Sequence, residues 1–178
     1  MDCTSIDTAR LHADLAQLLD YCTKLAGTAD VPAWSDFRPS AVPRLMAALY
    51  VAEPVNDGAG GVNDYRYRSY GALLPEYFGD DLRGKLLSDA RGDDFRHAIV
   101  EVYDAVLACR RPHALWVELY WPDGGSYQTG HLLIPFTDAN RAATILLGAV
   151  VSDVPRENLV LFRGKGMARM RGWGPPVP

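Results

Sequence analysis

The stretch from Asp93 to Asp153 constrains the fold more than any other part of this chain. Apolar residues recur every three or four positions over residues 93–110, which predicts an amphipathic helix with one buried face. Three strand-like runs follow at short intervals, Ala114–Trp121, Ser126–Phe136 and Thr144–Val151. A long helix that packs across an antiparallel meander predicts an α+β domain with an apolar space between the two layers.

Earlier parts of the chain add strands and short helices to this unit. Leu49–Val55 has the pattern of a buried strand, and Tyr65–Tyr70 alternates tyrosines with polar residues, as a half-buried strand does. Ala72–Phe78 and Asp81–Leu87 are predicted to be helical turns. Strands and helices do not alternate regularly, so a doubly wound parallel sheet is not expected. The sequence predicts a five-stranded antiparallel sheet with helices on one face.

The N-terminal segment, residues 1–28, is predicted to contain a separate amphipathic helix. Its apolar residues are spaced four, three, four and three positions apart, as in a heptad seam: Leu11, Leu15, Leu18, Cys22 and Leu25. A helix this short is marginal in water by itself, so the seam must pack on its own domain or on a second copy of the chain. We expect a dimerisation helix, and hence a homodimer.

Composition narrows the class of protein. Hydrophobic residues make up 48% of the 178 residues and charged residues 22%, proportions that are typical of a globular chain. No apolar run approaches the ~20 residues of a membrane span, and no secretory signal is recognisable. The three cysteines have no framework spacing. A cytoplasmic protein without a membrane partner is therefore expected.

The C-terminal segment, residues 154–178, differs in charge from the rest of the chain. It holds five basic residues and one acidic residue, a net charge of +4, so that residues 1–153 carry −8 of the total of −4. Such a basic tail can bind an acidic partner, or it can remain solvated and fold back on its own acidic domain. Nucleic acid is not an expected partner, because the aromatic motifs of RNA recognition are absent from the sequence.

Several short motifs occur in a fixed order between Trp34 and Val151. They are DFRP at 36–39, YRYRSYG at 65–71, YFGDDLRG at 77–84, RRP at 110–112, LIPF at 133–136 and ILLGA at 145–149. In this order they resemble short stand-alone bacterial PAS-domain proteins, which belong to the PAS sensor superfamily. The resemblance implies a PAS-like domain over residues 29–153 that acts as a ligand sensor or a dimerisation module. It also implies no fused output domain and no assigned ligand.

Folds of this kind leave room for a ligand between the long helix and the sheet. The sequence predicts five residues around that space: Arg68, Tyr70, His97, Trp116 and His131. Arg68 can present its guanidinium to a carboxylate or phosphate of a ligand. The alternative is a structural ion pair with an aspartate at position 80, 81 or 89.

The other predicted site residues also have two interpretations each. His97 lies early in the long helix, where some haem-binding PAS domains carry their iron ligand, but no local motif supports haem, and a surface histidine is the alternative. His131 can be a hydrogen-bonding group in the cavity or an exposed residue. Trp116 and Tyr120 share a strand face that is either covered by the N-terminal helix or exposed to a partner.

The sequence contains no motif for catalysis or metal binding. The four histidines show no pair at metal-ligand spacing, the cysteine motif of flavin photosensors is missing, and no nucleophile elbow occurs. The sequence thus identifies no metal, no catalytic residue and no cofactor. We expect a non-enzymatic sensory or protein-interaction module in signalling, with its output in a partner protein.

One alternative belongs to a different functional class. A small-molecule-binding enzyme or carrier with a cone-shaped α+β pocket, resembling ketosteroid isomerase or the polyketide cyclases, would need an Asp/His or Asp/Tyr dyad inside the cavity. The nearest candidate is His131 with Tyr127, and no convergent carboxylate is evident.

Overall fold

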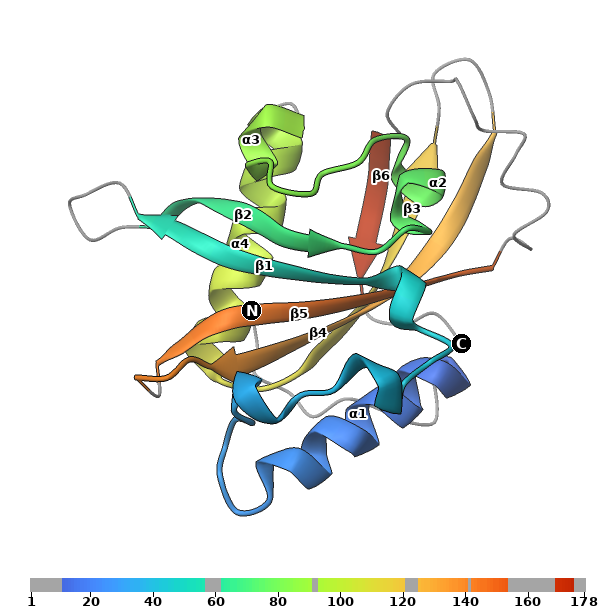
Figure 1. Cartoon of the computed structure of the whole chain (residues 1–178). Coiled ribbons are helices and arrows are strands. Elements are labelled where there is room, and N and C mark those ends of the chain that lie inside the picture. Colours follow the sequence, from blue (N-terminus) through green and yellow to red (C-terminus); the bar gives the residue numbers. More distant parts are fainter. Residues whose placement is uncertain are drawn as a thin grey trace.

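The computed structural model describes residues 11–56, 62–90, 93–120, 125–140, 142–153 and 169–174. Its centre is an antiparallel sheet with the strand order β2-β1-β5-β4-β3-β6 (Figure 1). The strands are β1 (Leu49–Asn56), β2 (Val62–Tyr70), β3 (His113–Tyr120), β4 (Ser126–Thr137), β5 (Ala143–Ser152) and β6 (Arg169–Gly174). The helices are α1 (Ala13–Ala26), α2 (Leu74–Phe78), α3 (Leu87–Ala90) and α4 (Asp93–Cys109), with 3₁₀ turns η2 (Trp34–Asp36), η3 (Pro39–Ala41) and η4 (Met46–Ala48).

This architecture confirms the predicted fold class. The five expected strands and the long helix are all present, and α4 ends one residue before the predicted limit. Consecutive strands β3, β4 and β5 form the expected meander, and β1 pairs with both β2 and β5. The chain is therefore an α+β protein with a PAS-like sheet.

A sixth strand lies in the segment that was interpreted as a basic tail. β6 pairs antiparallel with β3, so that Trp116 is opposite Gly174 and Tyr120 is opposite Arg169. Two of its six residues are glycines, which are depleted in strands, and the sequence pattern therefore did not predict it. Residues 154–168 and 175–178 of the predicted tail lie outside the described residues.

The sheet separates two hydrophobic layers. We call the face that packs against α2, α3 and α4 the inner face, and the face that packs against α1 and the η turns the outer face. Helices α4 and α1 lie on opposite sides of the strands (Figure 1). Because side chains alternate along each strand, neighbouring residues such as Leu132 and Leu133 enter different layers.

Helix α1 buries its seam on its own sheet. Leu15, Leu18 and Cys22 are at most 1% exposed and belong to the outer layer with Ile134 and Phe136. His12 caps the helix, since its Nδ1 accepts a hydrogen bond from the backbone N–H of Asp14 at 3.2 Å. Cover for the heptad seam is thus intramolecular, which is the first of the two alternatives that the sequence left open.

Strand β2 is fixed to the short helices beside it. The buried carboxylate of Asp64 accepts hydrogen bonds from the backbone N–H and the hydroxyl of Ser88, in the first turn of α3. Tyr67 exchanges backbone hydrogen bonds with the segment that precedes α3, accepting from Gly84 at 2.7 Å and donating to Lys85 at 3.1 Å. These bonds pair part of β2, which is an edge strand of the sheet, and they fix α3 and the segment before it beside the inner layer.

Two cysteines lie in the described part of the chain. Cys22 is free, and burial raises the pKa of its thiol to about 12. Cys109, the last residue of α4, is disulfide-bonded, which the cysteine spacing did not indicate. Within the described ranges, no helix is long and apolar enough to cross a bilayer, and no cluster of three or more His, Cys, Asp or Glu side chains could hold a metal.

Candidate functional site

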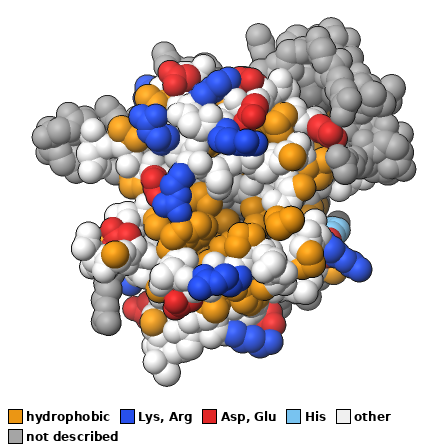
Figure 2. Space-filling model, viewed as in Figure 1, with side chains coloured by type: hydrophobic (Ala, Val, Ile, Leu, Met, Phe, Trp, Pro, Cys, Tyr) orange, Lys and Arg blue, Asp and Glu red, His pale blue; other side chains and the backbone are white. Residues whose placement is uncertain are grey.

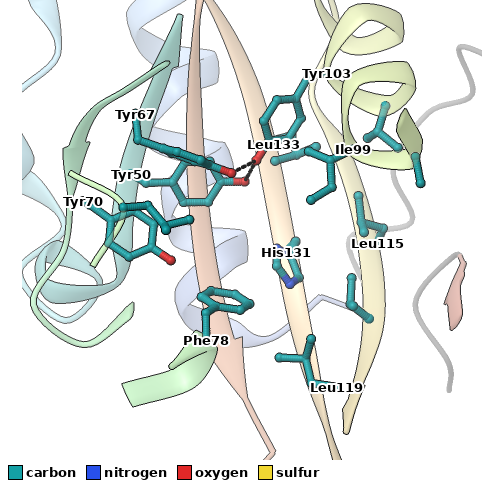
Figure 3. Close-up of a pocket in the computed structure, with 14 residues that line it drawn as sticks. Tyr50, Tyr67, Tyr70, Phe78, Ile99, Tyr103, Leu115, Leu119, His131 and Leu133 are labelled. Atoms are coloured by element: carbon teal, nitrogen blue, oxygen red, sulfur yellow. Dashed lines mark hydrogen bonds between the residues drawn. The ribbon is translucent and has the colours of Figure 1, made fainter. Parts of the chain in front are cut away.

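A cavity of about 70 Å³ lies between α4 and the inner face of the sheet. Residues from β1, β2, β3, β4, α4 and the region of α2 line it (Figure 3): Tyr50, Tyr67, Tyr70, Phe78, Leu82, Ala98, Ile99, Val102, Tyr103, Leu115, Val117, Leu119, His131 and Leu133. One water needs about 10–15 Å³ of such space, so the cavity has room for about five waters or one small ring. Aliphatic and aromatic groups make up most of its wall.

Three tyrosine hydroxyls meet at one end of this cavity. Tyr103, on α4, donates a hydrogen bond to the hydroxyl of Tyr50, on β1, at 2.8 Å. The hydroxyls of Tyr67 and Tyr103 are 3.3 Å apart and are also hydrogen-bonded. Figure 3 shows the three hydroxyl groups pointing toward one another. The rings of Tyr50 and Tyr67 pack edge to face, with their centroids 5.5 Å apart.

Gly148 on β5 makes room for the Tyr50 ring. A Cβ atom at Gly148 would lie 2.0 Å from Cζ of Tyr50, which is well inside van der Waals contact. Gly148 is paired with Tyr50 across the β1–β5 ladder, so the ring lies directly over the glycine. Only glycine at this position lets the Tyr50 side chain cross β5 and reach Tyr103.

Burial keeps the tyrosine cluster uncharged. Removal from solvent raises the pKa of Tyr50 and the pKa of Tyr103 well above that of a free tyrosine. Tyr67 adds to both shifts, whereas the hydrogen bond with Tyr103 lowers the pKa of Tyr50. Tyr65 is held in the same way, because its hydroxyl is buried and donates to Asp104 on α4 at 2.6 Å. Three tyrosine hydrogen bonds, one to β1 and two to β2, therefore connect α4 to the sheet.

His131 on β4 is the other polar group in the cavity wall. Its Nε2 is 2.9 Å from the hydroxyl of Thr129, which is fully buried, and its ring lies 6.0 Å from that of Phe78. Loss of solvent lowers the pKa of His131 to about 4, since no carboxylate compensates the charged form. The imidazole is therefore neutral at pH 7, and the fourteen lining residues include no charged group.

The structure brings two of the five predicted site residues into the cavity wall. Tyr70 and His131 line the cavity, as expected. His97 is exposed on α4, with its Nε2 3.3 Å from a guanidinium nitrogen of Arg96, and it does not line the cavity. Trp116 is half-buried and lies against Gly130 on the outer face, so it is on the other side of the sheet from the cavity.

Arg68 is also on the outer side of the sheet. Its guanidinium pairs with Glu53 at 2.5 Å and lies 5.1 Å from the ring centroid of Trp34. The aspartates at positions 80, 81 and 89 have other partners: Lys85, Arg83 and the backbone N–H of Leu86, respectively. The expectation that Arg68 faces the cavity is therefore incorrect, and its ion-pair partner differs from those predicted.

A β-bulge explains why Arg68 and Tyr70 point in opposite directions. Val51 pairs with Ser69 and Ala52 pairs with Tyr67, so that Arg68 is an extra residue in β2. Strict alternation would place Arg68 on the same face as Tyr70. The bulge instead turns Tyr67 and Tyr70 to the inner face and leaves Arg68 outside.

Sequence analysis did not identify the central hydroxyl cluster as part of the site. The signal for Tyr67 was present, because the tyrosines of 65–70 were assigned to one strand face. Tyr103 lies on α4 one position from the apolar stripe residue Val102, and Tyr50 begins an otherwise apolar run. Neither position has a local pattern that marks a site, since their proximity depends on how β1 packs against α4.

Three comparisons with known proteins bear on identity. The sequence model of a family described as "PAS domain" matches residues 10–151. No curated protein matches the chain at a significant level. The chain is similar to a solved light-oxygen-voltage domain from a study of its mechanism with a flavin analogue. That domain is 16% identical, with a TM-score of 0.45, and the match covers 71% of this chain and 92% of that one.

Two further solved structures are similar to a comparable degree. The light state of the blue-light photoreceptor Aureochrome1 LOV is 10% identical, covering 65% of this chain and 87% of that one, with a TM-score of 0.42. The Rhodobacter sphaeroides LOV protein is 16% identical, covering 63% and 62%, with a TM-score of 0.43. With TM-scores below 0.5, these likenesses carry no part of the argument that follows.

Proposed function

This chain belongs to the PAS domain family, and from that premise we propose that it is a non-enzymatic sensory or interaction module whose ligand binds in the cavity beside α4. Sensory modules are the general role of the family. The observation that carries the proposal is the cavity itself, which is apolar, lies between α4 and the sheet, and has two polar groups at its wall, the tyrosine hydroxyl cluster and His131. Such a pocket, apolar with a few convergent polar groups, is the usual form of a small-molecule site.

A ligand in this cavity is placed to influence α4. Ala98, Ile99, Val102 and Tyr103 come from α4 and form one wall of the cavity. Three hydrogen bonds join α4 to the sheet: Tyr103 to Tyr50, Tyr67 to Tyr103 and Tyr65 to Asp104. A ligand that binds one position of α4 more tightly than another would shift the helix between them, which is how a sensor passes on its signal. We propose that a separate signalling protein reads that shift.

The lining residues favour binding over catalysis. An enzyme of the ketosteroid isomerase or cyclase type needs a carboxylate in the cavity to pair with a histidine or tyrosine. No Asp or Glu is among the fourteen residues that line it. Tyr127, the proposed partner of His131, donates its hydroxyl to the backbone carbonyl of Tyr77 and does not line the cavity. The alternative function therefore has no supporting group at this site.

The ligand site is tested by detecting a retained small molecule and by filling the cavity with a larger side chain. Native mass spectrometry of the purified protein should show a bound compound of low mass. Ala98→Leu adds three carbon atoms on the α4 wall and should reduce the bound fraction. Ala105→Leu, on the same helix and outside the lining, is the matched control and should leave it unchanged. Equal occupancy in both variants would show that the cavity is not the binding site.

We also propose that the protein acts as a homodimer through α1. The seam of α1 is covered by its own sheet, so the remaining surface of the helix, with exposed Ala13 and half-buried Ala16, must provide the contact. Ala13→Glu with Ala16→Glu should convert a dimer to a monomer in sedimentation experiments, whereas Gln17→Glu should not. In the view of Figure 2 hydrophobic side chains gather over the middle of the sheet. If the double variant remains a dimer, the interface is not on α1, and the hydrophobic surface in Figure 2 is the next candidate.

The cytoplasmic location remains a prediction, and the disulfide at Cys109 is the observation against it, because disulfides persist mainly in oxidising compartments. Alkylation of thiols in intact cells tests it. A cytoplasmic protein should be found with Cys109 alkylated. If Cys109 is protected until a reductant is added, the predicted location is wrong.

A further inference from the structure

The tyrosine cluster leaves one hydrogen-bond donor without an acceptor at the cavity wall. A phenol has a single hydrogen, and that of Tyr103 is donated to Tyr50. Tyr67 must therefore be the donor in its bond with Tyr103. The chain of bonds runs from Tyr67 through Tyr103 to Tyr50, and the hydrogen of Tyr50 has no acceptor among the described residues. Tyr50 is only 4% exposed and lines the cavity, so its acceptor must come from whatever occupies the cavity.

His131 supplies a second polar group that is incompletely paired. Its Nε2 bonds to Thr129, and its Nδ1 makes no hydrogen bond within the described part of the chain. The hydroxyl hydrogen of Thr129 is donated to the backbone carbonyl of Val117 at 3.3 Å, so Nε2 is the donor in its bond with Thr129, and Nδ1 is an acceptor. A hydroxyl group of a ligand can donate to Nδ1.

Charge and size restrict the ligand further. No Asp, Glu, Lys or Arg is among the fourteen lining residues, and burial keeps Tyr50 and His131 neutral at pH 7. A charged ligand would therefore be buried without a counterion. A volume of about 70 Å³ accommodates one small ring. Aromatic neighbours, Phe78 and Tyr70 among them, offer faces and edges for a ring to pack against.

We propose that the cavity takes a small uncharged ring compound bearing a hydroxyl group, and that this hydroxyl accepts a hydrogen bond from Tyr50. The proposal rests on the cavity being a ligand site, as in the proposed function. It excludes the carboxylate or phosphate ligand that Arg68 was expected to bind, because Arg68 lies on the other side of the sheet with Glu53.

The test compares two pairs of probes by isothermal titration calorimetry. Phenol and toluene have the same shape and differ in the hydroxyl. Benzyl alcohol and benzoate are close in size and differ in charge. Phenol should bind the wild-type protein about tenfold more tightly than toluene, which is the value of one buried hydrogen bond. Benzyl alcohol should bind, and benzoate should not.

Variants of the cluster assign the hydrogen bond. Tyr50→Phe removes the free donor and should weaken phenol to the level of toluene, with toluene itself unaffected. Tyr21→Phe is the matched control, because Tyr21 lies in the outer layer, where its hydroxyl accepts from the backbone N–H of Arg38. It should bind both compounds as the wild-type protein does. Circular dichroism of each variant establishes that the fold is intact before binding is compared.

The outcomes separate the two proposals. Equal affinity for phenol and toluene, or tighter binding of benzoate than of benzyl alcohol, would overturn the assignment of the ligand class and leave the cavity as a ligand site. Unchanged preference for phenol in Tyr50→Phe would overturn the role of Tyr50. Failure of all four compounds to bind would overturn the ligand class and the proposed ligand site together.

Discussion

The two faces of the sheet are made by the same strands and yet are packed in different ways. The buried residues of the outer layer are mostly aliphatic side chains and phenylalanines; among them Leu132, Ile134 and Phe136 are fully buried. The inner layer contains five buried tyrosines from β1, β2 and α4, and it encloses a cavity. Side chains fill the outer layer, whereas the inner layer contains a cavity.

This difference indicates which face carries function. A buried hydroxyl must find hydrogen-bond partners or destabilise the fold, whereas phenylalanine at the same positions would have no such requirement. Seven tyrosines on one face, these five with Tyr77 and Tyr127, are therefore more than packing requires, and their hydroxyls must have partners to be tolerated. Asp104 and the tyrosines themselves are some of those partners. The hydroxyl hydrogen of Tyr50 has no such partner among the described residues, which favours a ligand as its acceptor.

The first prediction compares the same truncation on the two faces. Leu132→Ala removes a fully buried side chain from the outer layer and should destabilise the protein by about 3–5 kcal/mol. Leu133→Ala should cost less, about 2–3 kcal/mol, because Leu133 borders the cavity and lacks neighbours on that side. Urea denaturation measures both. Equal costs would mean that the inner layer is as densely packed as the outer one.

The second prediction concerns pH and the buried histidine of the inner face, His131. The pKa of His131 is about 4 in the folded protein, below the ordinary value of 6.5 that it regains on unfolding. The unfolded state therefore binds the proton first, and stability is fully present above pH 6.5 and is lost as pH falls toward 4. The loss should reach about 3 kcal/mol at the acid end.

The contribution of His131 is isolated by difference. His131→Gln should remove this part of the pH dependence, while carboxylates and His113, whose pKa is also lowered by burial, contribute equally to both proteins. Stability is compared at pH 7 and pH 4.5 by thermal unfolding. A wild-type protein and a variant with parallel pH profiles would mean that the imidazole is not desolvated in the fold.

These comparisons also show what the sequence could and could not reveal. Element types and order follow from local periodicity, which is why five strands and α4 were predicted close to their observed limits. Tyr70 and His131 were correctly placed at the cavity because their strands were correctly identified. β6 was missed, since its strand character depends on the edge of β3 and not on its own residues.

The errors at the site have one common cause. Facing a cavity is a property of register and packing, and a single extra residue reverses it. The bulge at Arg68 moved that residue to the outer face, and the direction of β3 placed Trp116 there as well. Tyr50 and Tyr103 are 53 positions apart, and no local pattern shows that they meet.

The third prediction tests the close approach that makes the inner cluster. Gly148→Ala places a Cβ 2.0 Å from the Tyr50 ring and should destabilise the protein by about 1–3 kcal/mol. Gly130→Ala is the counterpart on the outer face, where the nearest atoms, of Val151 and Trp116, are 3.0 and 3.1 Å away. Small side-chain shifts relieve that contact, so its cost should be lower in the same denaturation experiment. The reverse order would show that Tyr50 has an alternative position.

The last and smallest effect is expected at Arg68. Its ion pair with Glu53 is solvent-exposed, with 44% of the arginine side chain accessible, and such pairs contribute about 0–1 kcal/mol. Stacking on Trp34 adds a contribution of similar size. Arg68→Ala should therefore lower stability by about 1 kcal/mol or less, measured by urea denaturation, and should leave phenol affinity in the calorimeter unchanged. Loss of ligand binding in this variant would contradict the assignment of function to the inner face, because Arg68 reaches only the outer one.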